Sequence, residues 1–270
     1  IKSSAASDVY KRQIGFSCID VYQNLDKRYA TGNGIDCIVN LAKRGIQTSA
    51  ITTVGTDLYG KEMLDLCKEY EIDSSHIQVN EGDTSVFYMT LKNGTDRFHI
   101  KNVPGVMENY TPTREDIEFT KTHDYVHTDM FGHVLHLLPE FREAGCKIIL
   151  DFSLNKDFDV LGPVLRNTNY GFFSFEKYDD NIQDFLKKAY SYGPDIVTAT
   201  FGEEGSMSYD GSTFYRQGIY PAAEIVNTVG AGDSFISGFV YGLIQGMDIP
   251  GCLDCGARTS SEIVQKFNPY

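Results

Sequence analysis

The chain is poor in basic residues: its 270 positions include 24 lysines and arginines against 37 aspartates and glutamates, which gives a formal net charge of −13. It has no long basic run. Nucleic acids and anionic membranes are bound by clustered lysine and arginine, so both partners are disfavoured. No apolar stretch reaches the roughly 18 residues that a membrane-spanning helix needs. We therefore expect a small-molecule partner.

Cysteine is also sparse, with six residues at positions 18, 37, 67, 146, 252 and 255. They are scattered and no secretory signal precedes them, so we expect a reduced, cytoplasmic chain without a disulfide framework. Cys252 and Cys255 form a C-x-x-C pair, but no second pair completes a zinc site. We interpret them as two small apolar side chains on one face of a helix.

The organisation of the chain indicates one domain over residues 14–270. Residues 1–13 show neither helical nor strand periodicity, and we expect them to be a non-native leader. Residues 14–20 resemble the end of a buried first strand. Further expected strands, at 48–54, 125–128, 147–151, 170–174 and 195–200, alternate with helical stretches. This alternation predicts an α/β fold with a mostly parallel sheet and helices on both faces.

Residues 84–101 predict a β-hairpin, because Asn93 and Gly94 form a strong turn signal between alternating segments. A hairpin inserted between βα units suggests a lid.

The strongest chemical signal is Asn-Thr-Val-Gly-Ala-Gly-Asp at residues 227–233. The glycine turn and the helix expected after it can aim backbone N–H groups at an anion, with Asp233 at the helix start. An ordinary N-cap, with Gly246 ending the helix, explains the same residues. The local pattern leaves both readings open.

The seven residues resemble the signature Asp-Thr-x-Gly-Ala-Gly-Asp of the ribokinase-like (PfkB) carbohydrate kinases, and other parts match in order from about residue 14 to the end. The resemblance implies a three-layer sandwich with a small β lid, here at about 22–31 and 84–101. It implies ATP and Mg²⁺ as cofactors, and often a homodimer formed through the lids. Asp233 would accept the proton of a substrate hydroxyl, while the amides of Gly230, Ala231, Gly232 and Asp233 would stabilise the transferring phosphoryl group.

The resemblance extends to the nucleotide and its ions. Thr-Phe-Gly-Glu-Glu-Gly at 200–205 resembles the nucleotide loop of the family. The residues that it assigns to ATP are Thr200, Gly202, Gly205, Asn227 and Thr228. Glu176 is the candidate for orienting magnesium, in place of a motif that is not cleanly present. A monovalent cation such as K⁺ is also implied near residue 227, where asparagine replaces the acidic residue of the signature.

The sugar side is indicated by Thr-Gly-Asn-Gly-Ile-Asp at 31–36, which resembles the Gly-Gly-x-x-x-Asn turn of the family and departs from it at both ends. The resemblance assigns Asp20, Gly32, Asn33 and Asp36 to the substrate. Arg97 would reach over it from the lid, although a solvated arginine explains that position equally.

Four histidines at 123, 127, 133 and 136 are crowded together, but their expected placement does not favour a metal site. Residues 127–133 instead resemble those of fructoselysine 6-kinases, which adds His127 and His133 to the substrate residues. Fructosamines such as fructoselysine are therefore the expected substrates, phosphorylated on the 6-hydroxyl. The extra carboxylate of Asp36 would suit an amine.

Other activities are weighed against this one. A kinase for fructose, ribose or a nucleoside shares the motifs, and a catalytically weak sugar- or nucleotide-binding protein could keep the fold. A dinucleotide-binding dehydrogenase is disfavoured because the turn at 32–37 lacks the third glycine. No P-loop motif occurs.

Overall fold

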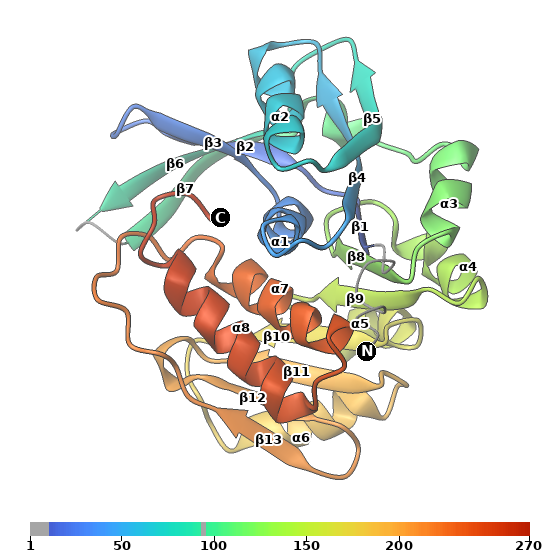
Figure 1. Ribbon diagram of the computed structural model, residues 1–270, viewed down its shortest axis with the longest axis vertical. Helices are drawn as coiled ribbons and strands as arrows, with labels where there is room; N and C mark the ends of the chain where they lie inside the picture. Colours follow the sequence, from blue (N-terminus) through green and yellow to red (C-terminus); the bar gives the residue numbers. More distant parts are fainter. Residues whose placement is uncertain (1–10, 93–95) are drawn as a thin grey trace, which may run out of the picture.

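The computed structural model describes residues 11–92 and 96–270. Residues 1–10, most of the expected leader, and the turn expected at Asn93 and Gly94 lie outside the described residues. The described strands form two sheets, a large one at the centre and a small one beside it (Figure 1).

The large sheet has the order β13-β12-β11-β10-β9-β8-β1-β4-β5. Neighbouring strands are parallel from β11 to β5, while β12 and β13 run antiparallel at one edge. Its strands are β1 (Lys11–Ile14), β4 (Thr48–Gly55), β5 (Asp73–Asn80), β8 (Tyr125–Asp129), β9 (Lys147–Asp151), β10 (Tyr170–Ser174), β11 (Ile196–Thr200), β12 (Ser206–Tyr209) and β13 (Phe214–Gln217).

Helices cover both faces of this sheet. The helices are α1 (Asn33–Ala42), α2 (Leu58–Glu69), α3 (Arg114–Lys121), α4 (Leu138–Glu143), α5 (Phe158–Leu165), α6 (Asn181–Tyr190), α7 (Ala231–Ile244) and α8 (Ile249–Ile263). Apolar residues of α1, α2, α7 and α8 pack on one face, and those of α3 to α6 pack on the other. The expected α/β class, with a mostly parallel sheet between helical layers, is confirmed.

The strands of the large sheet are apolar on both faces, as a sheet buried between two helical layers requires. Along β9, Ile148 and Leu150 belong to the core under α4 and α5, whereas Ile149 packs with α7. The strand has a single polar residue at its carboxyl end, Asp151. Because parallel strands end at the same edge, this edge collects the polar side chains.

The small sheet has the order β3-β2-β6-β7 and comprises β2 (Cys18–Tyr22), β3 (Lys27–Thr31), β6 (Val86–Lys92) and β7 (Asp96–Val103). Its strands include those that we expected in the lid. Figure 1 shows it projecting from the large sheet on the side of the C-terminus.

The beginning of the described chain differs from the sequence-based expectation. Lys11 to Ile14 form β1, which pairs with β4 and β8 inside the large sheet, so the strand starts within the expected leader. It ends at Ile14 and does not continue to residue 20. Gly15, at φ 126°, passes close to the backbone of Gly132, and a new strand, β2, begins in the small sheet at Cys18. The hydrophobic pattern could not separate two consecutive buried strands that belong to different sheets.

Among the described residues, no helix combines the length and apolar character needed to cross a bilayer.

Candidate active site

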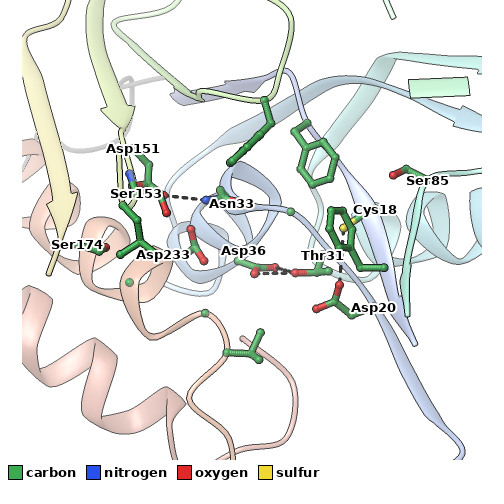
Figure 2. Close-up of a pocket in the computed structure, with 18 of the residues that line it drawn as sticks. Cys18, Asp20, Thr31, Asn33, Asp36, Ser85, Asp151, Ser153, Ser174 and Asp233 are labelled. Carbon is green, nitrogen blue, oxygen red and sulfur yellow. Dashed lines mark hydrogen bonds between the residues drawn. The ribbon is translucent and has the colours of Figure 1, made fainter. Parts of the chain in front are cut away.

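A cavity of about 610 Å³ lies where the small sheet faces the carboxyl ends of the central strands. Side chains from both sheets and from the N-terminal turns of α1 and α7 line it (Figure 2). Among the expected site residues, those that line it are Asp20, Gly32, Asn33, Asp36, His133, Thr200, Thr228, Gly230, Gly232 and Asp233. Residues up to 213 positions apart in the sequence, Asp20 and Asp233, thus border one space.

Asp233 lies in the first turn of α7, which begins at Ala231 after Gly230. Gly230 has φ 71°, and a Cβ there would overlap Pro269, so this turn requires glycine. A Cβ on Gly232 would meet nothing within 4 Å, because that position borders the cavity.

The N-cap residue of α7 is Gly230, which has no side chain to cap the helix. The amide of Ala231 donates to the carbonyl of Thr228 at 3.3 Å, so it is already engaged. The partial positive charge of the helix end is directed at the cavity, and it suits a phosphate bound beside Asp233.

Asn227 is placed differently from the other expected nucleotide residues. It is fully buried, and its Nδ2 donates to the carbonyl of Phe267 at 2.9 Å and lies 3.3 Å from the hydroxyl of Tyr22. Its Oδ1 accepts the amide of Val229. This side chain ties the start of the signature turn to the C-terminal segment and does not border the cavity.

The turn between β3 and α1, which we expect to bind the sugar, presents Gly32, Asn33 and Asp36 to the cavity. Gly32 has φ 140°, and a Cβ there would lie 2.8 Å from the carbonyl oxygen of Phe16, so the turn requires glycine. The two departures from the family turn contact each other, because the Thr31 hydroxyl lies 2.8 and 2.7 Å from the two carboxylate oxygens of Asp36. The Cys18 thiol lies 3.8 Å from Oδ1 of Asp20.

Two acids lie side by side at the ends of β8 and β9. Asp129 and Asp151 are paired in register, and Asp151 borders the cavity. Burial raises the pKa of Asp129 to about 7, with a contribution from the charge of Asp151. Burial also raises the pKa of Asp151, against the hydrogen bonds from Asn33 and Ser153 and the charge of Lys156. The two residues are 22 positions apart in the sequence, and the pairing of β8 with β9 brings them together.

The loop at 200–205, which we expect to bind the nucleotide, adjoins the cavity through Thr200. Thr200 and Ser174 line it from β11 and β10. Gly202 and Gly205, at φ 54° and 95°, shape the loop behind Thr200 without bordering the cavity. The backbone of Glu176 passes beside Gly202, and its side chain is not part of the lining.

The remaining expected residues are distributed unevenly. His133 borders the cavity with φ 59°, whereas His127 is fully buried within β8 and does not border it. Arg97 lies in β7, and its side chain is outside the described part of the chain. His99 borders the cavity from the same strand and was not foreseen, because nothing in the sequence distinguishes the inward-facing positions of that strand.

The charged side chains that line the cavity are predominantly acidic. Five acids line it, namely Asp20, Asp36, Glu108, Asp151 and Asp233, and none of the described lining residues is lysine or arginine. Within residues 11–92 and 96–270, no group of three or more His, Cys, Asp or Glu side chains is arranged to hold a metal ion.

Comparisons with known proteins agree with this architecture. The profile of the pfkB family carbohydrate kinases matches residues 8–174 and 170–270. Fructoselysine 6-kinase of Escherichia coli (strain K12) is 31% identical over 252 residues, which span 93% of this chain and 96% of that protein. Fructosamine kinase FrlD of Bacillus subtilis (strain 168) is 28% identical over 264 residues, spanning 95% and 91%.

Among solved structures, Arabidopsis thaliana ribokinase complexed with ribose and ATP superimposes with a TM-score of 0.81 at 19% identity, covering 98% of this chain and 94% of that one. At this level of identity the likeness concerns the fold.

Proposed function

The chain belongs to the pfkB family of carbohydrate kinases, and we propose on this premise that Asp233 activates a sugar hydroxyl for phosphorylation by ATP. One observation carries the proposal. Asp233 lies at an uncapped helix N-terminus and shares one cavity with the sugar-side residues Asp20 and Asn33. A base and an anion-stabilising helix end beside a sugar site are the parts that phosphoryl transfer needs.

The chemical step would run between the two ends of the cavity. The carboxylate of Asp233 takes the proton of the hydroxyl, whose oxygen forms a bond to the γ-phosphorus as the bond to the β-phosphate oxygen of ADP breaks. The first-turn amides of α7 after Ala231 would bind the phosphoryl oxygens, on which negative charge is concentrated. Thr200 and Thr228 border the cavity where the phosphates would lie.

We propose that magnesium enters with ATP. Five lining acids and a polyphosphate would repel one another, so a divalent cation is needed to offset their charge. The described residues offer no preformed metal cage, which fits an ion held mainly by the phosphates. Glu176 would act on this ion only after its side chain turned toward the cavity.

Potassium is a separate question, because Asn227 stands where the family signature has an acid. Its Nδ2 faces the carbonyl of Phe267, and its Oδ1 accepts an amide. Both ends of the Asn227 amide are thus engaged by the protein, and we propose that it contributes no potassium ligand. Turnover measured in potassium, sodium and choline salts tests this statement.

For the substrate, we propose a fructosamine such as fructoselysine, phosphorylated on its 6-hydroxyl. The support is the similarity to two kinases named for these compounds, together with a cavity whose charged lining is mostly acidic. Carboxylates favour a ligand that carries an ammonium group. Fructose, ribose and nucleosides lack this group, and the same carboxylates would bind them through hydroxyls alone.

The test is ADP release measured with fructoselysine, fructose, ribose and adenosine. We expect the highest kcat/KM with fructoselysine. Asp36→Asn should lower kcat/KM for fructoselysine more than for fructose, because it removes a charge that only the amine uses. Equal losses on both sugars would remove Asp36 from amine recognition, and preference for a neutral sugar in the wild type would overturn the substrate assignment.

We also propose that two copies associate through their lids. β7 is an edge strand of the small sheet, and Phe98 and Ile100 are 47% and 54% exposed on it. Exposed apolar edge strands are sites of pairing between chains. A dimer in sedimentation analysis that becomes monomeric with Phe98→Lys and Ile100→Lys is the expected result.

A further inference from the structure

Asn33, the first residue of α1, contacts an acid that the sugar-binding turn does not contain. Its Nδ2 lies 2.8 Å from Oδ2 of Asp151, although the two residues are 118 positions apart. Figure 2 shows this hydrogen bond as a dashed line between Asn33 and Asp151. Both residues line the cavity.

The other oxygen of Asp151 is also held. Oδ1 accepts the amide of Ser153 at 2.8 Å, in a turn where Ser153 has φ 51°. The carboxylate therefore has one oxygen fixed by the backbone and one directed at Asn33. The nitrogen of the Asn33 amide, which is a hydrogen-bond donor, therefore faces an acceptor oxygen of Asp151.

This contact determines which atom Asn33 offers to a ligand. One hydrogen of Nδ2 is engaged by Asp151, and the carbonyl oxygen Oδ1 on the other side of the amide accepts no hydrogen bond from the described residues. The carbonyl is an acceptor without a donor function. Asp20 and Asp36, which line the same cavity, carry acceptors as well.

We propose that Asp151 is a positioning residue that fixes the amide of Asn33 so that its carbonyl oxygen faces the ligand, and that this part of the cavity therefore favours a hydroxyl or ammonium donor on the sugar. The proposal rests on the proposed sugar kinase function and specifies which ligand groups the site recognises. A carboxylate or phosphate at the same position would face the carbonyl oxygen of Asn33, another acceptor. Sugar acids and sugar phosphates are thereby disfavoured at this end.

The variant Asp151→Asn tests the proposal because it should reverse Asn33 without removing the contact. The amide of Ser153 still requires an acceptor, so the new side chain would give its carbonyl to Ser153 and its nitrogen to residue 33. Asn33 would then turn its own carbonyl toward residue 151 and its nitrogen toward the ligand. An acceptor in the cavity becomes a donor.

The expected result is a rise in sugar KM of about 10- to 100-fold, as an unpaired polar contact implies. The kcat and the KM for ATP should change less than about threefold, because Asp233 and the nucleotide loop are untouched.

The double variant Asn33→Asp with Asp151→Asn, which swaps the two side chains, is the control for Asp151→Asn. It keeps the total charge and the hydrogen bond, and it again places an acceptor in the cavity. Sugar KM should return to within about threefold of the wild type. An unchanged KM in Asp151→Asn, or an equally raised KM in the single and swapped variants, would overturn the proposal.

Thermal unfolding of each variant shows whether a loss is structural. If Asp151→Asn does not fold, Asn33→Ala takes its place, since it removes the acceptor and keeps Asp151. A raised KM in Asn33→Ala and a normal KM in the swap support the proposal, and equal values contradict it. All variants are assayed with whichever of fructoselysine and fructose the wild type phosphorylates faster. Wild-type turnover thus tests the proposed function, and the comparison of the single and swapped variants tests the role of Asp151.

Discussion

The hydroxyl of Thr31 lies 2.8 and 2.7 Å from the two carboxylate oxygens of Asp36, and both side chains are buried. These are the two positions at which the turn departs from the family pattern. The departures form a contact with each other, in which a donor on β3 serves a carboxylate on α1. A change at one position is therefore expected to be felt at the other.

Thr31→Val should destabilise the protein by about 2 kcal/mol, because a buried carboxylate loses a donor. When Asp36→Asn is already present, Thr31→Val should cost about 1 kcal/mol less, because residue 36 then carries no charge that needs the Thr31 hydroxyl as a donor. Urea unfolding of both single variants and the double variant measures the coupling. If the two losses in unfolding free energy simply added in the double variant, the contact between Thr31 and Asp36 would be contradicted.

Asp233→Asn should lower kcat by about 10²- to 10⁴-fold, the usual range for removing a general base. The KM for sugar and the melting temperature should change little, because the amide keeps the shape of the side chain. Steady-state kinetics measure this. The matched control is Asp248→Asn, an aspartate at the start of α8 that caps the helix through Gly251 and is not part of the cavity lining. Similar losses in both variants would show that charge at a helix start is responsible.

Asn227→Asp restores the acid of the family signature and should destabilise this chain by about 2 kcal/mol. A carboxylate oxygen would replace the nitrogen that donates to Phe267, so two acceptors would face each other. Thermal unfolding in choline chloride measures the loss. Potassium should restore stability if the new carboxylate creates a cation site, whereas an unchanged melting temperature in choline would contradict the assigned hydrogen bonds.

Asp129→Asn should stabilise the protein above neutral pH. Burial raises the pKa of Asp129 from 3.8 to about 7, so the folded state holds the proton while the unfolded chain releases it. The stability that this group provides is full below about pH 4 and is lost as the pH rises to about 7. The Asp129→Asn variant has no carboxyl group to ionise at this position, so its stability does not fall in this pH range.

The advantage of Asp129→Asn should therefore grow by about 2 kcal/mol between pH 5 and pH 8, measured by urea unfolding. Asp157→Asn, at an exposed helix cap, controls for the removal of one negative charge. An advantage that is constant with pH would show that Asp129 does not keep its proton in the fold.

Gly34→Ala should destabilise the protein by about 1–3 kcal/mol, because the new Cβ would overlap the side chain of Gln13. Gln13 is fully buried in β1, and its Oε1 meets no donor among the described residues. Gln13→Ala should therefore rescue Gly34→Ala by about 1 kcal/mol or more. Urea unfolding of the two single variants and the double variant measures this rescue. If Gln13→Ala gave no rescue, the close packing of β1 on α1 would be contradicted.

Much of the fold could be predicted from the sequence because it depends on local patterns. The alternation of strands and helices gave the layered architecture, and the glycine turn before Asp233 gave the start of α7. The sequence could not show that β1 ends at Ile14, since two short buried strands in succession have the same pattern as one. The family profile and the E. coli relative confirm the carbohydrate kinase assignment.

The parts of the site that could not be predicted depend on contacts between distant segments. Nothing near Asn33 indicates that Asp151 fixes its amide, and nothing near Asn227 indicates that Phe267 accepts its hydrogen bond. The sequence placed Asn227 with the nucleotide because the signature does so. Such roles depend on the order of the strands in the sheet and on which distant segments lie next to each other. The pattern of residues along the sequence does not contain this information.

The acidic lining of the cavity also has a kinetic consequence. In the free enzyme, five carboxylates would oppose the approach of a nucleotide polyphosphate, even one that is partly neutralised by a metal ion. A substrate that brings a positive charge would lower this electrostatic barrier when it binds. The two substrates would then be coupled through charge alone, and we expect sugar-first, ordered addition, with the affinity for ATP rising after the amine has bound.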